Sequence, residues 1–277
     1  METLTFGYGL LEGPRPDGDG GIYFSDVTRG GVYRLAPDGT VDVVVPKRKG
    51  VGGIALHADG GIVISGRNIC HVRDGETRVL FEQEDVAGYN DLFTDEEGCV
   101  YTGSLRESPF RLEGERAKGE AYRIEGEGQA RELYGEVGLS NGLGFSPDGR
   151  FLYHSDSTAE ALIVHELDGG RVVPGSRTAI EVTGTPDGLV VDENGGIWVA
   201  VVGPGVVRRY TPDGRLDREI DMPAGMVTSL CFAGSDRRDL IVVTADNTED
   251  PERKGTIFRL PAADVGAVGV PAPAARV

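Results

Sequence analysis

The sequence predicts an all-β fold, a six-bladed β-propeller with four-stranded blades, on three observations. The chain has 43 glycines and 15 prolines in 277 residues, and this is about twice the usual share of glycine. Short apolar runs alternate with turn signals, and amphipathic helical periods are nearly absent. One strand–turn–strand pattern recurs six times, at intervals of about 40 to 50 residues, which are typical of propeller blades.

Each repeat begins with a polar or small residue and an apolar strand, and a turn leads to a second apolar strand. These two segments are 12–14 and 22–26, 52–56 and 62–65, 90–93 and 100–103, 141–145 and 151–154, 187–191 and 197–200, and, more weakly, 228–232 and 240–243. A third strand follows, for example 31–35, 121–124 or 206–210, and most units close with a fourth, such as 40–45 or 130–134. Six units use up the chain without a Pro/Ser-rich linker, so we expect one domain over residues 1–277.

Composition and charge exclude several classes of function. The chain carries 45 acidic and 28 basic residues, for a net charge of -17, which repels nucleic acid and anionic membrane surfaces. No apolar run is long enough to cross a bilayer, and the N-terminus lacks the features of a secretion signal. Cys70, Cys99 and Cys231 are far apart in apolar contexts, which predicts buried free thiols in a reducing compartment. We therefore expect a cytoplasmic protein, a monomer or small homo-oligomer, with a small-molecule partner and no nucleic acid or membrane partner.

The lead-in residues of the repeats predict a functional site. The first strand of each propeller blade lines the central channel, so rotation should bring the six lead-in residues together at one mouth: Glu12, Gly52, Asn90, Asn141, Asp187 and Thr228. Two carboxylates in a narrow channel repel each other and need a cation or a shared proton. Carboxylate and carboxamide oxygens favour a hard divalent ion such as Ca²⁺, Mg²⁺ or Mn²⁺. Three protein ligands would leave positions open for water and substrate.

Turn formation is the competing explanation for several of these residues. Pro-Asp-Gly occurs five times, and four of its aspartates lie between strands and are expected to form turns: Asp17, Asp38, Asp148 and Asp213. Asp187 differs because it stands at a strand start, directly before an apolar run. Asn90 and Asn141 could instead bridge neighbouring blades, and Glu12 could be a solvated side chain.

Five segments carry a resemblance to a known family. They are Glu12-Gly-Pro, 89–91, 140–143, 186–188 with 197–200, and 228–232. In this order, each at a blade start, they resemble the regucalcin/gluconolactonase family, which includes luciferin-regenerating enzyme, over nearly the full chain. The resemblance implies a metal held by Glu12, Asn141 and Asp187, with Asn90 and Asp91 on the substrate side and Asn90 touching the metal directly or through water. It also implies lactone hydrolysis with one divalent ion, Ca²⁺ before Zn²⁺, Mn²⁺ or Mg²⁺.

The sequence departs from this family at the substrate side. Sugar-lactonase members have an Arg where this chain has Gly88, and their Asn-Asp-Gly is Asn90-Asp91-Leu92 here. Both changes argue against an aldonolactone substrate. Residues 105–109 resemble the family's lid or substrate loop, so Arg106 or Glu107 could contact the substrate or belong to a solvated loop. The stretch 106–127 is rich in charge and is expected to be an exposed, mobile loop.

These expectations combine into a metal-dependent hydrolase of a small cyclic ester, of the lactonase type. The metal would polarise the carbonyl and activate water, Asp187 would act as general base, and Asn90 would orient the substrate. Two alternatives remain open: a non-catalytic propeller that binds a metal or a protein partner, and a metal-dependent enzyme for other small esters, organophosphates or an isomerisation.

Overall fold

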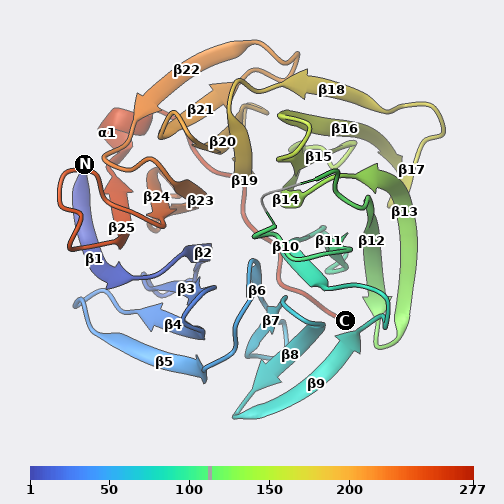
Figure 1. The fold of residues 1–277 in the computed structure, drawn as a ribbon, viewed down its shortest axis with the longest axis horizontal. Coiled ribbons are helices and arrows are strands. Elements are labelled where there is room, and N and C mark those ends of the chain that lie inside the picture. The colour runs from blue at the N-terminus through green and yellow to red at the C-terminus, as the bar shows by residue number, and fades with distance from the viewer. Residues whose placement is uncertain (112–113) are drawn as a thin grey trace.

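The computed structural model describes residues 1–111 and 114–277, and its strands form six antiparallel sheets around a central axis (Figure 1). In the first three sheets the strands follow chain order from the axis outward. Blade one has β2 (Leu11–Pro16), β3 (Ile22–Asp26), β4 (Gly31–Leu35) and β5 (Val41–Pro46), and blade two has β6 (Ile54–Leu56), β7 (Ile62–Ile64), β8 (Ile69–Arg73) and β9 (Glu76–Phe81). Blade three has β10 (Gly88–Thr94), β11 (Val100–Leu105), β12 (Gly119–Gly126) and β13 (Gln129–Val137). The expected six-bladed propeller is therefore confirmed.

The remaining blades complete the ring with two variations. Blade four has β14 (Ser140–Phe145), β15 (Phe151–Asp156), β16 (Ala161–Asp168), β17 (Arg171–Val172) and β18 (Thr178–Glu181). Blade five has β19 (Thr185–Val191), β20 (Ile197–Val202), β21 (Val206–Tyr210) and β22 (Leu216–Asp221). Blade six has β23 (Val227–Ala233), β24 (Asp239–Thr244) and β25 (Gly255–Leu260). The fourth sheet has five strands, because both the short β17 and β18 pair with β16.

The last blade is built from both ends of the chain. The N-terminal strand β1 (Glu2–Tyr8) pairs with β25 and supplies the outer strand of the sixth sheet, in the order β1-β25-β24-β23. The short helix α1 (Ala262–Val265) follows β25. This pairing ties the N-terminal strand to the C-terminal blade and so closes the ring.

One expectation was wrong. The stretch 106–127 is not a single exposed loop, because residues 119–126 form β12 between β11 and β13. Its charged residue Arg123 is buried and makes ion pairs with Asp95, Glu97 and Glu125. Paired charges of this kind can enter a strand that composition alone assigns to a loop.

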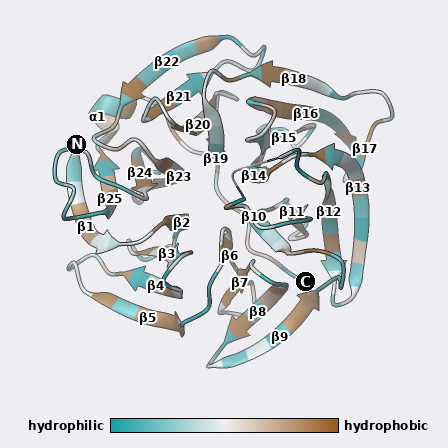
Figure 2. Cartoon of the chain, viewed as in Figure 1, coloured by the Kyte–Doolittle hydropathy of each residue, from teal (hydrophilic) through white to brown (hydrophobic). Residues whose placement is uncertain are grey.

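The apolar core lies between neighbouring blades and near the axis. Figure 2 shows mostly hydrophobic strands around the centre, while the outer strands β13 and β22 alternate between hydrophobic and hydrophilic residues. Trp198 is fully buried and packs edge-on against Phe232 of the next blade, with ring centroids 5.9 Å apart. Cys70 and Cys231 are buried and Cys99 is half-buried, and all three are free thiols.

Candidate metal centre

The inner strands start around the centre of the ring, on the side that faces the viewer in Figure 1. Five of them have an irregular register near the lead-in residue. The break encloses the lead-in residue and the residue after it in β10, β14 and β19, residue 228 alone in β23, and residues 13 and 14, directly after Glu12, in β2. Bulges re-aim side chains and are common next to functional sites. The shared distortion in β10, β14 and β19 therefore gives Asn90, Asn141 and Asp187 the same local geometry at the channel.

Glycines leave room for these side chains. A Cβ atom at Gly52 would lie 2.2 Å from Oδ1 of Asn90, so the glycine at this lead-in position accommodates the Asn90 carboxamide. A Cβ at Gly142 would lie 2.3 Å from the backbone nitrogen of Leu189 in the next blade. The close approach of inner strands explains why small residues follow the lead-in positions.

The two asparagines are hydrogen-bonded to each other across blades three and four. Nδ2 of Asn90 donates to Oδ1 of Asn141 at 2.5 Å and to the backbone oxygen of Ser140 at 2.8 Å. Nδ2 of Asn141 donates to the Ser157 hydroxyl at 2.7 Å, and that hydroxyl donates to the backbone oxygen of Pro186 in blade five at 2.6 Å. The bridging of neighbouring blades, which was the alternative to a metal role for these asparagines, is thus present, and it orients the carboxamide oxygen of Asn141.

Three carboxylates interact electrostatically in the same place. Burial, Asp187 and Asp91 raise the pKa of Glu12 well above its ordinary value, although hydrogen bonds from Gly13 and Ser229 oppose the shift. Burial and Asp91 raise the pKa of Asp187 in the same direction. Burial raises the pKa of Asp91 to about 6, against the opposing charge of Arg15. Within residues 1–111 and 114–277, none of the three carboxylates forms an ion pair with an Arg, Lys or His.

This donor set suits a hard divalent cation. Glu12, Asp91 and Asn141 are 6%, 9% and 8% exposed, whereas Asn90 and Asp187 are half-buried. Crowded buried carboxylates without a counter-charge favour uptake of a cation or of protons, and carboxylate and carboxamide oxygens are ligands of Ca²⁺, Mg²⁺ and Mn²⁺. The residues present fit the ion that the sequence predicts.

The sixth lead-in position does not follow the prediction. The hydroxyl of Thr228 donates to the backbone oxygens of Leu11 and Val243, at 2.6 and 3.1 Å, and so it joins blade six to blade one. Ser229, one residue later, lies beside Glu12 instead and lowers the pKa of its carboxyl. The break in β23 encloses one residue rather than two, which shifts the phase of the strand. Ser157 and Ser229 were not predicted, and small polar residues beside the lead-in positions are the only sequence signal for them.

The two residues expected in the substrate loop have partners of their own. Arg106 forms ion pairs with Glu120 and Asp85, and Glu107 forms one with Arg111. Their contact with a substrate stays a prediction.

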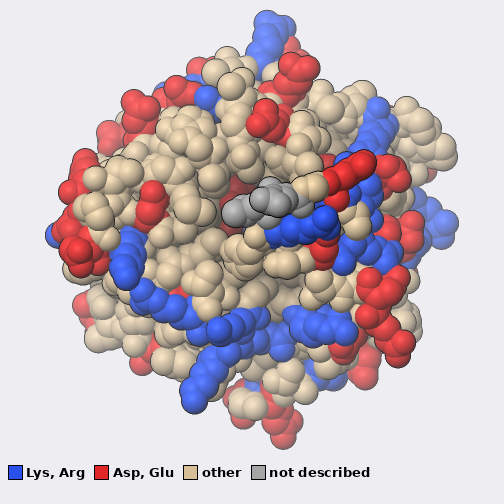
Figure 3. Space-filling view, viewed as in Figure 1, with Lys and Arg blue, Asp and Glu red and all other residues tan. Residues whose placement is uncertain are grey.

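Basic side chains border the channel mouth over the first three blades (Figure 3). They come from the loops after β3, β5, β7 and β11, which lie at the same end of the blades as the inner-strand starts. We call this group the basic arc: Arg29, Lys47, Arg48, Lys49, Arg67 and Arg106. It is a local exception to the strong negative charge of the chain.

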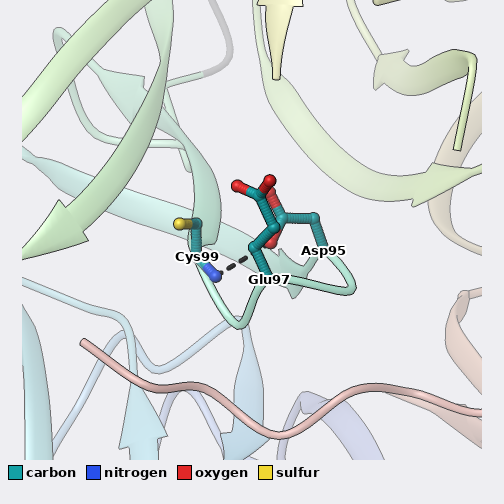
Figure 4. Close-up of side chains that lie close together, drawn as sticks. All are labelled: Asp95, Glu97 and Cys99. Atoms are coloured by element: carbon teal, nitrogen blue, oxygen red, sulfur yellow. Dashed lines mark hydrogen bonds between the residues drawn. The ribbon is translucent and has the colours of Figure 1, made fainter. Parts of the chain in front are cut away.

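A second group of potential ligands lies at the other end of blade three (Figure 4). Single ligand atoms of Asp95, Glu97 and Cys99 lie within 4.8 Å of one another, and Oδ1 of Asp95 accepts a hydrogen bond from the Cys99 backbone at 2.9 Å. Arg123 makes ion pairs with both carboxylates, with a distance of 3.0 Å to Asp95. Because Arg123 already pairs with both carboxylates, the lead-in residues are the better candidates for a metal.

No helix in the described part of the chain has the length and apolar character needed to span a membrane.

Fold and site together define a class: a six-bladed propeller with a crowded oxygen-donor cluster at one mouth of its channel. The family model described as "SMP-30/Gluconolactonase/LRE-like region" matches residues 10–246, and the chain belongs to this family. The resemblance inferred from the lead-in segments is thereby confirmed.

Relatives carry names of lactonases and of calcium-binding proteins. The chain is 31% identical over 244 residues to the 6-deoxy-6-sulfogluconolactonase of Pseudomonas putida, covering 83% of this chain and 81% of that protein. It is 28% identical over 281 residues to pentonolactonase XacC of Haloferax volcanii, covering 95% and 93%. This chain superposes on the crystal structure of a calcium-binding protein, regucalcin, from Agrobacterium tumefaciens with a TM-score of 0.85. The match covers 99% of this chain and 97% of that chain at 24% identity, and it shows the same fold.

Proposed function

We propose that this protein is a divalent-metal-dependent hydrolase of a small cyclic ester. The observation that carries the proposal is the convergence of the three carboxylates of Glu12, Asp91 and Asp187, with no ion pair in the described chain, beside two oriented carboxamides. The family and the lactonases among its members support the reaction class.

In this proposal Glu12, Asn141 and Asp187 hold the ion, and Asn90 completes or supports the set. The all-oxygen donors favour Ca²⁺, with Mg²⁺ and Mn²⁺ as alternatives, and Zn²⁺ also accepts carboxylates. A bound divalent ion would supply Lewis-acid polarisation of the ester carbonyl.

The residues of the chain divide the remaining tasks. Asp187 is half-buried as a residue, whereas Glu12 is 6% exposed, so substrate reaches Asp187 more readily than Glu12. A carboxylate in that place can take the proton of the attacking water, which assigns the general base to Asp187. The hydrogen bonds that hold Asn90 leave its carboxamide oriented toward the site to position the substrate.

The structure gives a steric reason to expect a substrate other than an aldonolactone. A Cβ atom at Gly88 would lie 2.7 Å from the backbone oxygen of Gly66. An arginine that binds sugar hydroxyls therefore does not fit at this position without a shift of the backbone. We expect a less hydroxylated lactone to be preferred.

The test is a lactone panel assayed on chelator-treated protein before and after each of Ca²⁺, Mg²⁺, Mn²⁺ and Zn²⁺ is added. We expect turnover to disappear with chelator and to return with one metal, and we expect Asp187→Asn to lose it while the fold is retained. Full turnover in Asp187→Asn would overturn the mechanism. Metal binding without turnover of any lactone or ester would favour the non-catalytic alternative.

A further inference from the structure

A cavity lies at the other mouth of the channel, away from the candidate metal centre. Its volume is about 380 Å³, within the range of small-molecule sites. Apolar side chains at the far ends of the inner strands form most of its wall: Phe93, Phe145, Val190, Val191 and Phe232. None of Glu12, Asn90, Asp91, Asn141 and Asp187 lines it, so the two sites are distinct.

The C-terminal segment covers this cavity. In Figure 1 it crosses behind the centre of the ring, and residues 270–273 line the cavity. One end of the segment is held where the Val270 backbone donates to Val191 at 3.2 Å. The other end is held where the backbone oxygen of Val277 accepts hydrogen bonds from His57 and Arg78, each at 3.1 Å. The cover is thus pinned on both sides of the opening.

Arg15 places a buried positive charge in this cavity. Its side chain lines the cavity, the residue is 8% exposed, and its guanidinium lies 5.0 Å from the ring centroid of Phe93. Nε donates to the backbone oxygen of Ile54 at 2.8 Å. Within the described chain the guanidinium forms no ion pair, and its two Nη groups have no hydrogen-bond acceptor.

Nearby groups do not neutralise this charge by contact. Burial raises the pKa of the Cys231 thiol to about 12, so the thiol is neutral. Asp91 attracts Arg15 over a distance but belongs to the carboxylate cluster of the other mouth. At the rim, Asp95 and Glu97 are paired with Arg123, Arg237 is paired with Glu193, and Glu96 is exposed to solvent. Burying an unpaired cation is costly, and this cost would be relieved by an anion.

We propose that the cavity is a second ligand site, which binds a small organic monocarboxylate with an apolar body. The two Nη groups of Arg15 would receive the carboxylate in the paired geometry that guanidinium groups favour. The aromatic and aliphatic wall would bury the apolar part of the ligand. The proposal does not depend on the lactonase function, because it uses neither the ion nor its ligands.

Octanoate is the probe, and n-octanol is its neutral counterpart. Both are titrated by calorimetry into chelator-treated protein, so that no divalent ion can bind the carboxylate. We expect octanoate to bind with a stoichiometry of one and more tightly than octanol. Arg15→Met should weaken octanoate binding by roughly 10- to 100-fold, whereas Arg15→Lys should keep part of the affinity.

Arg238→Met is the matched control, since it removes one positive charge from an exposed arginine that does not line the cavity. We expect its octanoate affinity to equal that of the wild type. Ala272→Trp, on the cover of the cavity, is the second variant; it should block binding while Arg15 stays in place, and it keeps the test valid if Arg15→Met does not fold.

Equal affinity for octanoate and octanol, or an unchanged affinity in Arg15→Met, would overturn the proposal. Absence of octanoate binding would also overturn it. If Arg15 serves only as a distant counter-charge for Asp91, Arg15→Met will change the affinity for the divalent ion and leave octanoate binding unchanged.

Discussion

Replacement of Gly52 by alanine tests the geometry of the candidate metal centre with a single methyl group. Gly52 has no positive φ, so its backbone conformation accepts alanine. The new Cβ would lie 2.2 Å from Oδ1 of Asn90, where ordinary contacts begin at 3.4 Å. The carboxamide must therefore move by about 1 Å, and misplacement of an orienting group by that amount can lower a rate by about 100-fold.

The assay is kcat/KM for the best lactone of the panel, measured with the activating metal, together with metal affinity by calorimetry. Gly135→Ala is the matched control, because its Cβ would come no closer than 4.0 Å to another atom, Cγ of Glu120. We expect this control to behave as the wild type. Thermal unfolding of both variants separates a local displacement from a loss of fold.

A double variant sharpens the test. In an Asn90→Ala background the main clash is gone, so Gly52→Ala should lower kcat/KM little further, which is the non-additivity expected of residues in contact. The reasoning would be refuted if Gly52→Ala keeps kcat/KM within about twofold of the wild type, or if its effect is the same in both backgrounds.

Three further predictions concern charge. Glu12→Gln relieves the repulsion among the buried carboxylates, so the metal-free variant should melt at a higher temperature than the metal-free wild type. The variant should also lose the stabilisation that metal gives the wild type, about 2.7 kcal/mol at a metal concentration of 100 times Kd. A lower melting temperature of the metal-free variant would contradict the charge crowding. Burial lowers the pKa of His165 from 6.5 to about 4, so the unfolded state takes up the proton first as the pH falls. The free energy of unfolding therefore decreases between these two pH values, by about 2 kcal/mol at pH 5. Denaturant titrations of His165→Phe should show this loss removed, and an unchanged pH dependence would argue against it. The basic arc should make kcat/KM for an anionic lactone fall by about tenfold from low to high salt, with little change for a neutral lactone; equal salt dependence of the two lactones would rule out steering.

Much of the candidate site could be predicted from the sequence because a propeller repeats one pattern. The strand–turn–strand period places Glu12, Asn90, Asn141 and Asp187 at the same phase of different blades, and rotation then brings distant residues together. The four aspartates expected in turns could be distinguished from Asp187 in the same way, because they lie between strands and Asp187 stands at a strand start. In the structure Asp148 accepts hydrogen bonds within its own turn, from Ser146 and Arg150, as predicted.

Other features depended on contacts between residues far apart in the sequence, which no local pattern encodes. Pairing of β1 with β25 joins the two ends of the chain, and the ion pair of Arg123 with Asp95 allows a charged residue to be buried in β12. The ion pairs of Arg106 with Glu120 and Asp85 likewise follow from the packing of blade three.

By itself the sequence determined the fold class, the number of blades and the lead-in residues of the candidate metal centre, because these depend on a period and its phase. Only the tertiary structure decided that Ser229 rather than Thr228 contacts Glu12, and that Arg15 faces a covered cavity at the far mouth. The physical reason is that successive residues of a strand point to opposite sides. A bulge of one residue instead of two therefore reverses the side chain that faces the channel.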